Sequence, residues 1–191
     1  MDMKTDFRKN IETERLFLTF PDSLTFELAI EIYKAIEESK NELKEFLPWV
    51  WNVNSAEEEF TSLKDYAVKN WTDKKGFFYF IKDKKTGELF GSIDLMDVNV
   101  KDKSGEIGFW LKTKATGNGY MAEALKALEK EAFENGFHRI QIKNDTKNIR
   151  SVNVTRNAGY HLDGVLREGT FDEHKGVFCD LNIWSKINPE G

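Results

Sequence analysis

The chain has 191 residues, of which 40% are hydrophobic and 13% aromatic, so it can bury the core of one domain and is not a disordered chain. Its net charge of −5, from 28 basic and 33 acidic residues, disfavours nucleic acid as a partner. No apolar run approaches the roughly 18 residues of a membrane span, and the N-terminus lacks the apolar segment of a signal peptide. A cytoplasmic protein without a membrane partner is therefore expected.

The first third of the chain predicts one strand followed by helices. We expect residues 1–10 to fray and residues 11–187 to form a single domain. Alternating apolar side chains predict a strand over residues 15–20. Ser55 and Glu58 form a capping-box pattern at the start of a helix. Apolar residues at helical spacing predict helices over 26–36, 41–46 and 55–71.

The remaining two thirds predict a sheet with two further helices. Residues 121–132 and 151–158 have helical patterns, and Gly136 and Gly159 follow them as helix-ending residues. Strand patterns occupy residues 77–81, 89–96, 106–111, 139–144, 160–167 and 177–185. The order of elements predicts an α/β protein whose central sheet is mixed, mostly antiparallel, has about seven strands and is flanked by helices.

A glycine-containing segment between a predicted strand and the long helix carries the clearest chemical signal. Gly117 and Gly119 allow a left-handed backbone and a close approach of a ligand. The helix that follows presents unpaired N–H groups and the positive end of its dipole. Together they predict an anion site that fits a pyrophosphate. A simple strand-to-helix turn remains the alternative on spacing alone.

The same segment also matches a dinucleotide-binding fingerprint, Gly117-x-Gly119-x-x-Ala122. Two observations disfavour a nicotinamide cofactor. Residues 112–116 separate the strand from the glycines, whereas the fingerprint follows its strand directly. The segment also comes after a predicted hairpin rather than at the start of a doubly wound sheet.

Several segments in order resemble the GNAT superfamily of N-acetyltransferases. The matching residues are Glu106-Ile-Gly-Phe-Trp-Leu111, Lys114-x-x-Gly-x-Gly119-Tyr-Met-x-Glu-Ala-Leu125, Asn148-Ile-Arg-Ser151 and Asn157-Ala-Gly-Tyr160. Gly164-Val-Leu-Arg167, Asp180, Thr13-Glu-Arg-Leu16 and Leu47-Pro-Trp49 extend the match toward the RimJ/RimL branch, whose characterised members acetylate N-terminal amines of ribosomal proteins. The resemblance covers residues 11–186.

The resemblance implies the GNAT fold and acetyl-CoA as co-substrate. It places the pantetheine arm along the strand at 106–111 and the pyrophosphate on the glycine segment, where Lys114 replaces the family's usual glutamine or arginine. It places Asn148 and Ser151 near the thioester. The implied cofactor-binding residues are Phe109, Trp110, Leu111, Lys114, Gly117, Asn118, Gly119, Tyr120, Met121, Asn148 and Ser151.

Two residues are candidates for proton transfer. Glu106 begins the strand that resembles the cofactor-pairing strand, so it is the candidate general base; an edge carboxylate paired with a lysine is the alternative. Thr155 stands where many relatives carry an acidic tyrosine, and Ser151 is the candidate hydroxyl beside the departing sulfur. Ser151 could instead only cap a helix and bind cofactor.

Other candidates for the base and for the acceptor groove are less defined. Glu168 and Asp172 lie near a position where some branch members place a carboxylate, although Thr170 occupies the position itself. Trp49 and Trp51 are candidates for the acceptor groove, with ordinary packing as the alternative.

No metal site is expected, because the three histidines are scattered and the one cysteine, Cys179, lies in a strand-like apolar context as an inert thiol.

These observations predict an acetyl-CoA-dependent N-acetyltransferase acting by direct attack of a primary amine, either a protein N-terminus or a small molecule. A non-catalytic acyl-CoA-binding or regulatory module is the alternative, since it would keep the glycine segment without a working acid and base. The oligomeric state, monomer or homodimer, is left open by the sequence.

Overall fold

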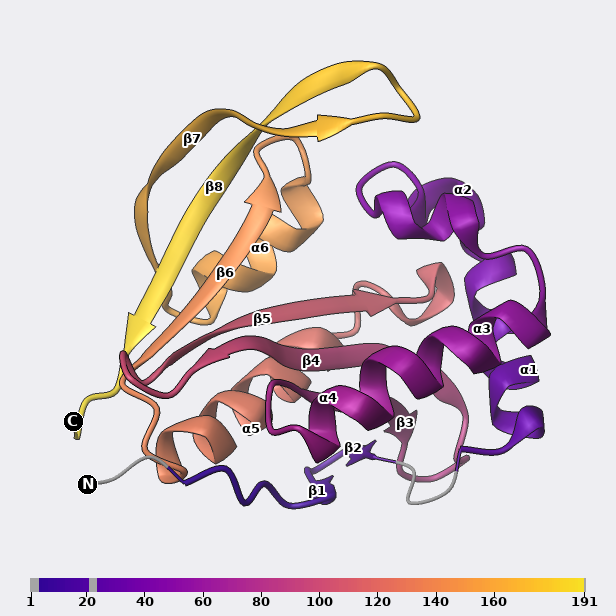
Figure 1. Cartoon of the computed structure of the whole chain (residues 1–191), viewed down its shortest axis with the longest axis horizontal. Helices are drawn as coiled ribbons and strands as arrows, with labels where there is room; N and C mark the ends of the chain where they lie inside the picture. The colour runs from indigo at the N-terminus through magenta and orange to yellow at the C-terminus, as the bar shows by residue number, and fades with distance from the viewer. Residues whose placement is uncertain (1–3, 21–23, 191) are drawn as a thin grey trace.

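One mixed sheet organises the fold in the computed structural model, which describes residues 4–20 and 24–190 (Figure 1). Its eight strands lie in the order β1-β2-β3-β4-β5-β6-β8-β7. They are β1 (Asn10–Glu12), β2 (Leu16–Thr19), β3 (Phe77–Asp83), β4 (Leu89–Asn99), β5 (Ser104–Leu111), β6 (Arg139–Asp145), β7 (His161–Asp172) and β8 (Val177–Ile187). Among these described strands only β5 and β6 pair parallel, so the expected mixed, mostly antiparallel sheet is confirmed.

The strand beyond the expected seven is β1, three residues long, which pairs with β2. The chain before it packs as well. Phe7 is buried and stacks on Phe77 with ring centroids 3.7 Å apart, and Arg8 Nε donates to Glu131 Oε2 at 2.6 Å. These contacts bring part of the segment that is expected to fray, from residue 4 onward, against the core, through one aromatic side chain in a polar stretch. Residues 1–3 lie outside the described residues.

Helices cover both faces of the sheet. One face carries α1 (Phe26–Glu37), α2 (Lys40–Leu43), η1 (Pro48–Asn52), α3 (Ala56–Leu63), η2 (Lys64–Val68) and α4 (Lys69–Thr72). The other face carries α5 (Tyr120–Glu134), and α6 (Ile149–Asn157) lies beside β6 (Figure 1). Each face has its own apolar core, centred on α5 for one and on α1 and α3 for the other. No helix within the described parts of the chain is long and apolar enough to cross a membrane.

Helix α3 has Ser55 as its N-cap and continues at its C-terminal end into a π-helical turn. Ser55 Oγ accepts from the Glu58 N–H at 3.2 Å, as its capping-box pattern predicts. The Glu58 carboxylate reaches the Asn54 N–H at 3.1 Å, one residue earlier than in the standard box. One wider turn, η2, then separates α3 from α4 without ending the helix. Such π turns change which side chains face a neighbouring element.

Candidate active site

The sheet opens where β5 and β6 separate. Their parallel pairing joins residues 104–106 to residues 139–141 and stops there. Beyond it β5 continues to Leu111 along β4, and β6 continues to Asp145 along β8. Figure 1 shows the two strands diverging from the edge where they meet. The inner edge of β5 from residue 107 to 111 therefore carries backbone groups that no described strand pairs with, which suits an extended ligand.

A cavity of about 1560 Å³ occupies this opening. That exceeds the roughly 300–1,000 Å³ of sites for one small ligand, so two molecules can meet in it. The cavity is charged differently at its two sides. Glu42, Glu45, Glu58, Glu59 and Asp94 line the side of α2, α3 and β4, whereas Lys143, Lys147, Arg150 and Asp145 line the side of β6 and α6.

The glycine loop, residues 116–119, forms one end of this cavity and leads into α5. Gly117 and Gly119 have φ values of +80° and +77°. A Cβ at Gly117 would meet no heavy atom within 4 Å, and one at Gly119 would meet only Arg15 Nη2, at 3.5 Å. The left-handed backbone thus explains both glycines and leaves space above the first N–H groups of α5, as an anion site requires.

Arg15 braces the glycine loop, a role that sequence patterns did not indicate. Its Nη1 donates to the Asn118 carbonyl oxygen at 2.9 Å, and its guanidinium lies 4.7 Å from the centre of the Tyr120 ring. Glu123 Oε2 accepts from Arg15 Nε at 2.7 Å. Partial burial acts to raise the pKa of the Glu123 carboxyl. The hydrogen bonds from Thr13 and Arg15 outweigh that contribution, so the pKa is lowered. Glu123 therefore stays ionised and holds the cation beside the loop.

Most of the residues expected to bind cofactor line the cavity, and three expected site residues do not. Lys114 has an 80% exposed side chain and pairs with Glu38 at 3.3 Å, pointing away. The Asn118 side chain folds back to the Thr116 carbonyl oxygen at 3.1 Å. Trp51, an expected groove residue, stacks on His174 instead. The lining residues of the expected set are Trp49, Glu106, Phe109, Trp110, Leu111, Gly117, Gly119, Tyr120, Met121, Asn148 and Ser151.

Glu106 lies at the point where β5 and β6 separate. Its Oε2 accepts from Gln141 Nε2 at 3.0 Å and from Lys143 Nζ at 2.7 Å. The lysine-paired arrangement that the sequence left open is thus present, but the carboxylate faces the cavity and its side chain is only 16% exposed. The carboxylate keeps one oxygen, Oε1, for a further partner.

The two other carboxylates considered as bases lie elsewhere. Neither Glu168 nor Asp172 is among the residues lining the cavity. Asp172 accepts from the His174 and Lys175 N–H groups in the turn between β7 and β8. Partial burial acts to raise the pKa of the Asp172 carboxyl, but hydrogen bonds from Lys175 outweigh that contribution and the pKa is lowered. Of the three carboxylates, only Glu106 has the position that a base in this cavity needs.

Ser151 is oriented by a buried polar network. Asn144 Nδ2 donates to Ser151 Oγ at 3.2 Å, so the serine oxygen is already an acceptor and its own proton remains to be donated. Asn144 Oδ1 in turn accepts from Asn182 Nδ2 and Trp184 Nε1, both at 3.1 Å. Asn148 caps α6 by accepting from the Ser151 N–H. No local sequence pattern indicated Asn144, Asn182 and Trp184, because they meet only through the pairing of β6 with β8.

Two buried carboxylates on the other side of the cavity were also missed. Asp94 on β4 is 9% exposed and Glu59 on α3 is 7% exposed. Burial raises the pKa of Asp94 to about 7 and that of Glu59 to about 7 as well. Tyr66, from η2, donates its hydroxyl to Asp94 Oδ2 at 2.6 Å. We call Glu59, Tyr66 and Asp94 the acidic wall.

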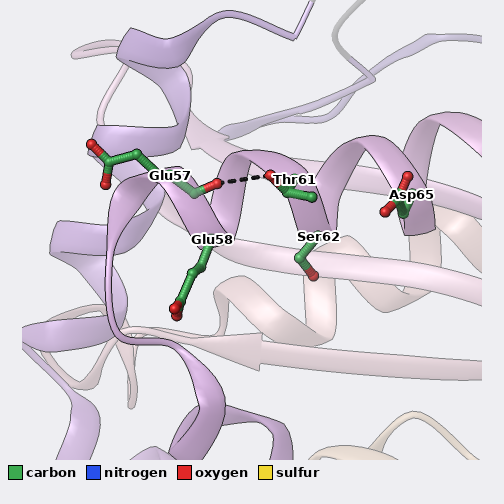
Figure 2. Close-up of a pocket in the computed structure, with 5 residues that line it drawn as sticks. All are labelled: Glu57, Glu58, Thr61, Ser62 and Asp65. Carbon is green, nitrogen blue, oxygen red and sulfur yellow. Dashed lines mark hydrogen bonds between the residues drawn. The ribbon is translucent and has the colours of Figure 1, made fainter.

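A shallow depression on α3, shown in Figure 2, is lined by Glu57, Glu58, Thr61, Ser62 and Asp65. Its one internal hydrogen bond runs from Thr61 Oγ1 to the Glu57 carbonyl oxygen, at 3.0 Å. Glu58 and Ser62 also line the large cavity. The depression therefore extends the negative charge of the cavity rim along α3 and forms no separate site.

The histidines and Cys179 were considered separately as metal ligands and as a reactive thiol. In residues 4–20 and 24–190, no group of three or more His, Cys, Asp or Glu side chains is placed to hold a metal ion. Burial, followed by Asp145, raises the pKa of the Cys179 thiol, which keeps it protonated as expected of an inert cysteine.

Comparisons with known proteins identify this arrangement. Residues 23–161 match the family model described as an acetyltransferase (GNAT) domain. The chain is 27% identical over 157 residues to the ribosomal-protein-serine acetyltransferase of Escherichia coli, covering 82% of this chain and 85% of the relative.

Solved structures agree with that match. The microcin C7 self-immunity acetyltransferase MccE, in complex with acetyl-CoA and AMP, has a TM-score of 0.83 at 26% identity, over 92% of this chain and 93% of that one. RimL, the ribosomal L7/L12 α-N-protein acetyltransferase in complex with coenzyme A, has a TM-score of 0.85 at 23% identity, over 93% and 97%, and supports the fold.

Proposed function

The chain belongs to the acetyltransferase (GNAT) domain family, and from this premise we propose that it moves the acetyl group of acetyl-CoA to a primary amine by direct attack. The observation that carries the proposal is the separation of β5 from β6. It opens a cavity large enough for two substrates and presents the edge of β5 to one of them. A relative of known acceptor is a ribosomal-protein-serine acetyltransferase, so the acceptor classes we propose are a protein N-terminus or a small-molecule amine.

The residues present fit coenzyme A. The left-handed Gly117 and Gly119 leave room for a diphosphate above the start of α5, where N–H groups and the helix dipole favour negative charge. Lys147 and Arg150 line the cavity from the side of β6 and α6 and add positive charge. When bound, acetyl-CoA supplies the activated acyl group. Phe109, Trp110 and Leu111 would lie along its pantetheine arm.

Proton transfer is the part of the reaction that the side chains must supply. Glu106 would accept a proton from the acceptor ammonium at its free oxygen, Oε1, and so release the lone pair that attacks. The new C–N bond forms as the C–S bond breaks, and the second proton, which the nitrogen loses as the amide forms, passes to the departing thiolate. Ser151 would donate a hydrogen bond to the departing sulfur, because Asn144 already supplies the donor to its own oxygen. Holding amine and thioester together accounts for much of the remaining acceleration.

A thiol-release assay tests the proposal. The protein is mixed with acetyl-CoA and, in turn, a seryl peptide, spermidine, an aminoglycoside and free amino acids, and free coenzyme A is measured. We expect amine-dependent thiol release with at least one class, together with thermal stabilisation by coenzyme A. Stabilisation without any amine-dependent release would favour the non-catalytic acyl-CoA-binding module. The absence of both would contradict the proposal.

A further inference from the structure

Asp94 places a carboxylate in the cavity from the middle of β4. The side chain is 9% exposed and lines the cavity on the side of α3. Tyr66, which lies 28 residues earlier in the chain on the wider turn η2, donates to its Oδ2 at 2.6 Å. Two elements that are distant in sequence thus direct polar atoms to one point of the cavity.

Gly108 allows the β5 backbone and the methyl group of Met96 to pack closely beside that carboxylate. It lies directly opposite Asp94 in the pairing of β4 with β5. A Cβ at position 108 would lie 3.0 Å from Asp94 Oδ1 and would overlap the methyl group of Met96. Gly108 also lines the cavity, just past the residues where β5 and β6 separate. Asp94 therefore lines the cavity opposite the part of β5 that lies just past this separation.

No cation among the described residues balances this carboxylate. The charged or titratable groups facing Asp94 are Tyr66 from η2, Asp97 from β4 and Glu106 from β5. The nearby Lys143 is bound to Glu106. Burial first, and then Glu106 and Asp97, raise the pKa of Asp94 to about 7, while the Tyr66 hydrogen bond opposes that rise. A buried carboxylate in this state gains most from a positively charged occupant.

Glu59 independently indicates the same kind of occupant. It is 7% exposed and lines the same cavity from α3. Burial is the sole cause of its raised pKa, so no described residue supplies it with a compensating positive charge. Two separate buried carboxylates on one cavity wall, each without a cation, make this side of the cavity complementary to a cationic ligand.

We propose that Asp94 is the residue that binds the acceptor amine as an ammonium ion, with Tyr66 as the positioning residue that orients its carboxylate. The inference rests on the proposed function, since it concerns the acceptor of the same cavity. An ammonium group offers three donors, one of which suits Asp94 Oδ1. Asp94 thus selects cationic acceptors and delivers them beside Glu106.

Binding of two probes of equal size tests this assignment. Butylammonium and butan-1-ol are titrated into the protein saturated with coenzyme A at about pH 8, where the amine is still charged. We expect the wild-type protein to bind butylammonium at least about tenfold more tightly than the alcohol, as a charge-assisted contact predicts. Asp94→Asn should bring the two dissociation constants within about twofold, because the amide still accepts from Tyr66 but carries no charge.

Two further variants separate ammonium binding from a purely structural role. Asp97→Asn removes an exposed negative charge three residues away on the same strand, and it should keep the preference for butylammonium. In Tyr66→Phe the preference for butylammonium should be weaker near pH 7 and should return at higher pH. Loss of the hydrogen bond raises the pKa of Asp94 further, so its carboxylate becomes charged only at higher pH. A merely structural contact would not give this pH dependence.

The outcomes distinguish this inference from the proposed function. No cation preference in the wild-type protein, or a preference that survives Asp94→Asn, overturns the inference even if acetyl transfer is observed. Coenzyme A binding and thiol release are measured separately. A protein that prefers butylammonium through Asp94 but never releases thiol would contradict the proposed function and support the ammonium site.

Discussion

The glycine loop and the acidic wall line the same cavity but are built in different ways. The glycine loop uses backbone conformation, with two left-handed glycines and the start of α5 in one short segment. The acidic wall uses side chains that come from α3, η2 and β4, up to 35 residues apart in sequence. The glycine loop is a local structure, whereas the acidic wall exists only after the helices have packed on the sheet.

This difference separates two kinds of recognition. A diphosphate has the same shape and charge in every reaction that uses coenzyme A, so a fixed backbone cradle can bind it. Acceptors can differ in shape and charge, and side chains on α3, η2 and β4 can be exchanged without disturbing the cradle. Substitutions in the loop should therefore abolish cofactor binding, whereas substitutions in the wall should change acceptor preference and pH dependence.

The largest effect is expected from Gly119→Glu. The substitution places a residue with a side chain in a left-handed backbone conformation, which is strained. It also places a negative charge where the diphosphate would lie. We expect the affinity for coenzyme A to fall by more than about 100-fold, measured by calorimetry, and thermal stabilisation by coenzyme A to disappear.

Gly87→Glu is the matched control. Gly87 also has a left-handed backbone, with φ of +75°, and a Cβ there meets no atom within 4 Å. It lies in the turn between β3 and β4 and does not line the cavity. It should lose some stability and keep its affinity for coenzyme A. Equal losses in both variants would remove the glycine loop from the binding site.

Glu106→Gln tests whether the carboxylate that lies between the glycine loop and the acidic wall is the general base. If Glu106 accepts the proton of the ammonium, kcat near pH 7 should fall by about 100-fold or more. The loss should shrink as pH rises past the pKa of the acceptor, about 8 for a terminal amine, because the amine then arrives neutral. Steady-state kinetics from pH 6 to 9 would measure it, with the KM for acetyl-CoA expected to change less than about twofold.

The rival carboxylates provide the comparison for that experiment. Glu168→Gln and Asp172→Asn alter carboxylates outside the cavity and should leave the pH profile unchanged. A flat profile for Glu106→Gln, or a loss confined to one of the rivals, would assign the base elsewhere.

Glu59→Gln should change the pH dependence of stability in addition to acceptor preference. Burial raises the folded-state pKa of Glu59 from 4.5 to about 7, so the folded protein holds this proton more tightly than the unfolded chain does. The resulting stability is complete below pH 4.5 and is lost as pH rises through 7. Near pH 8 the variant should therefore be more stable by about 2 kcal/mol, or about 5 °C in Tm.

The gain of Glu59→Gln should vanish in thermal melts near pH 4.5, where both proteins carry an uncharged side chain. Glu57→Gln, an exposed residue in the same helical turn, should show no such pH-dependent gain. A gain of equal size at both pH values would mean that Glu59 is not a buried charge at neutral pH.

The contrast between the two regions also explains what could be predicted from the sequence. Strand and helix periodicity predicted the described strands and α-helices except β1, which is three residues long and too short to show a period. The short 3-10 helices Pro48–Asn52 and Thr113–Ala115 were not predicted, for the same reason. The glycine loop was predicted because its signal is contiguous. Asp94, Tyr66 and Glu59 carried no local signal, since a single acidic or aromatic residue in an amphipathic segment becomes informative only when its neighbours across the fold are known.

The misplaced residues follow the same rule. Lys114 lies within the glycine motif, yet its side chain reaches Glu38 at the end of α1. Trp51 lies in a segment that resembles the family, but the turn between β7 and β8 brings His174 to stack on it, with ring centroids 5.1 Å apart. The sequence motif predicted where the backbone of these segments lies, while long-range contacts determine where the side chains of Lys114 and Trp51 point.

The smallest effect is expected from Ser151→Ala. The hydroxyl donates a single hydrogen bond to the leaving sulfur and is a poor formal acid, so kcat should fall only about three- to tenfold, or about 1 kcal/mol. Ser151→Thr keeps a hydroxyl on the turn that Asn148 caps and should restore most of the rate, which single-turnover kinetics can measure. If instead Ser151→Ala raised the KM for acetyl-CoA at unchanged kcat, the serine would belong with the glycine loop as a binding element, and proton transfer would depend on Glu106 alone of the two candidate residues.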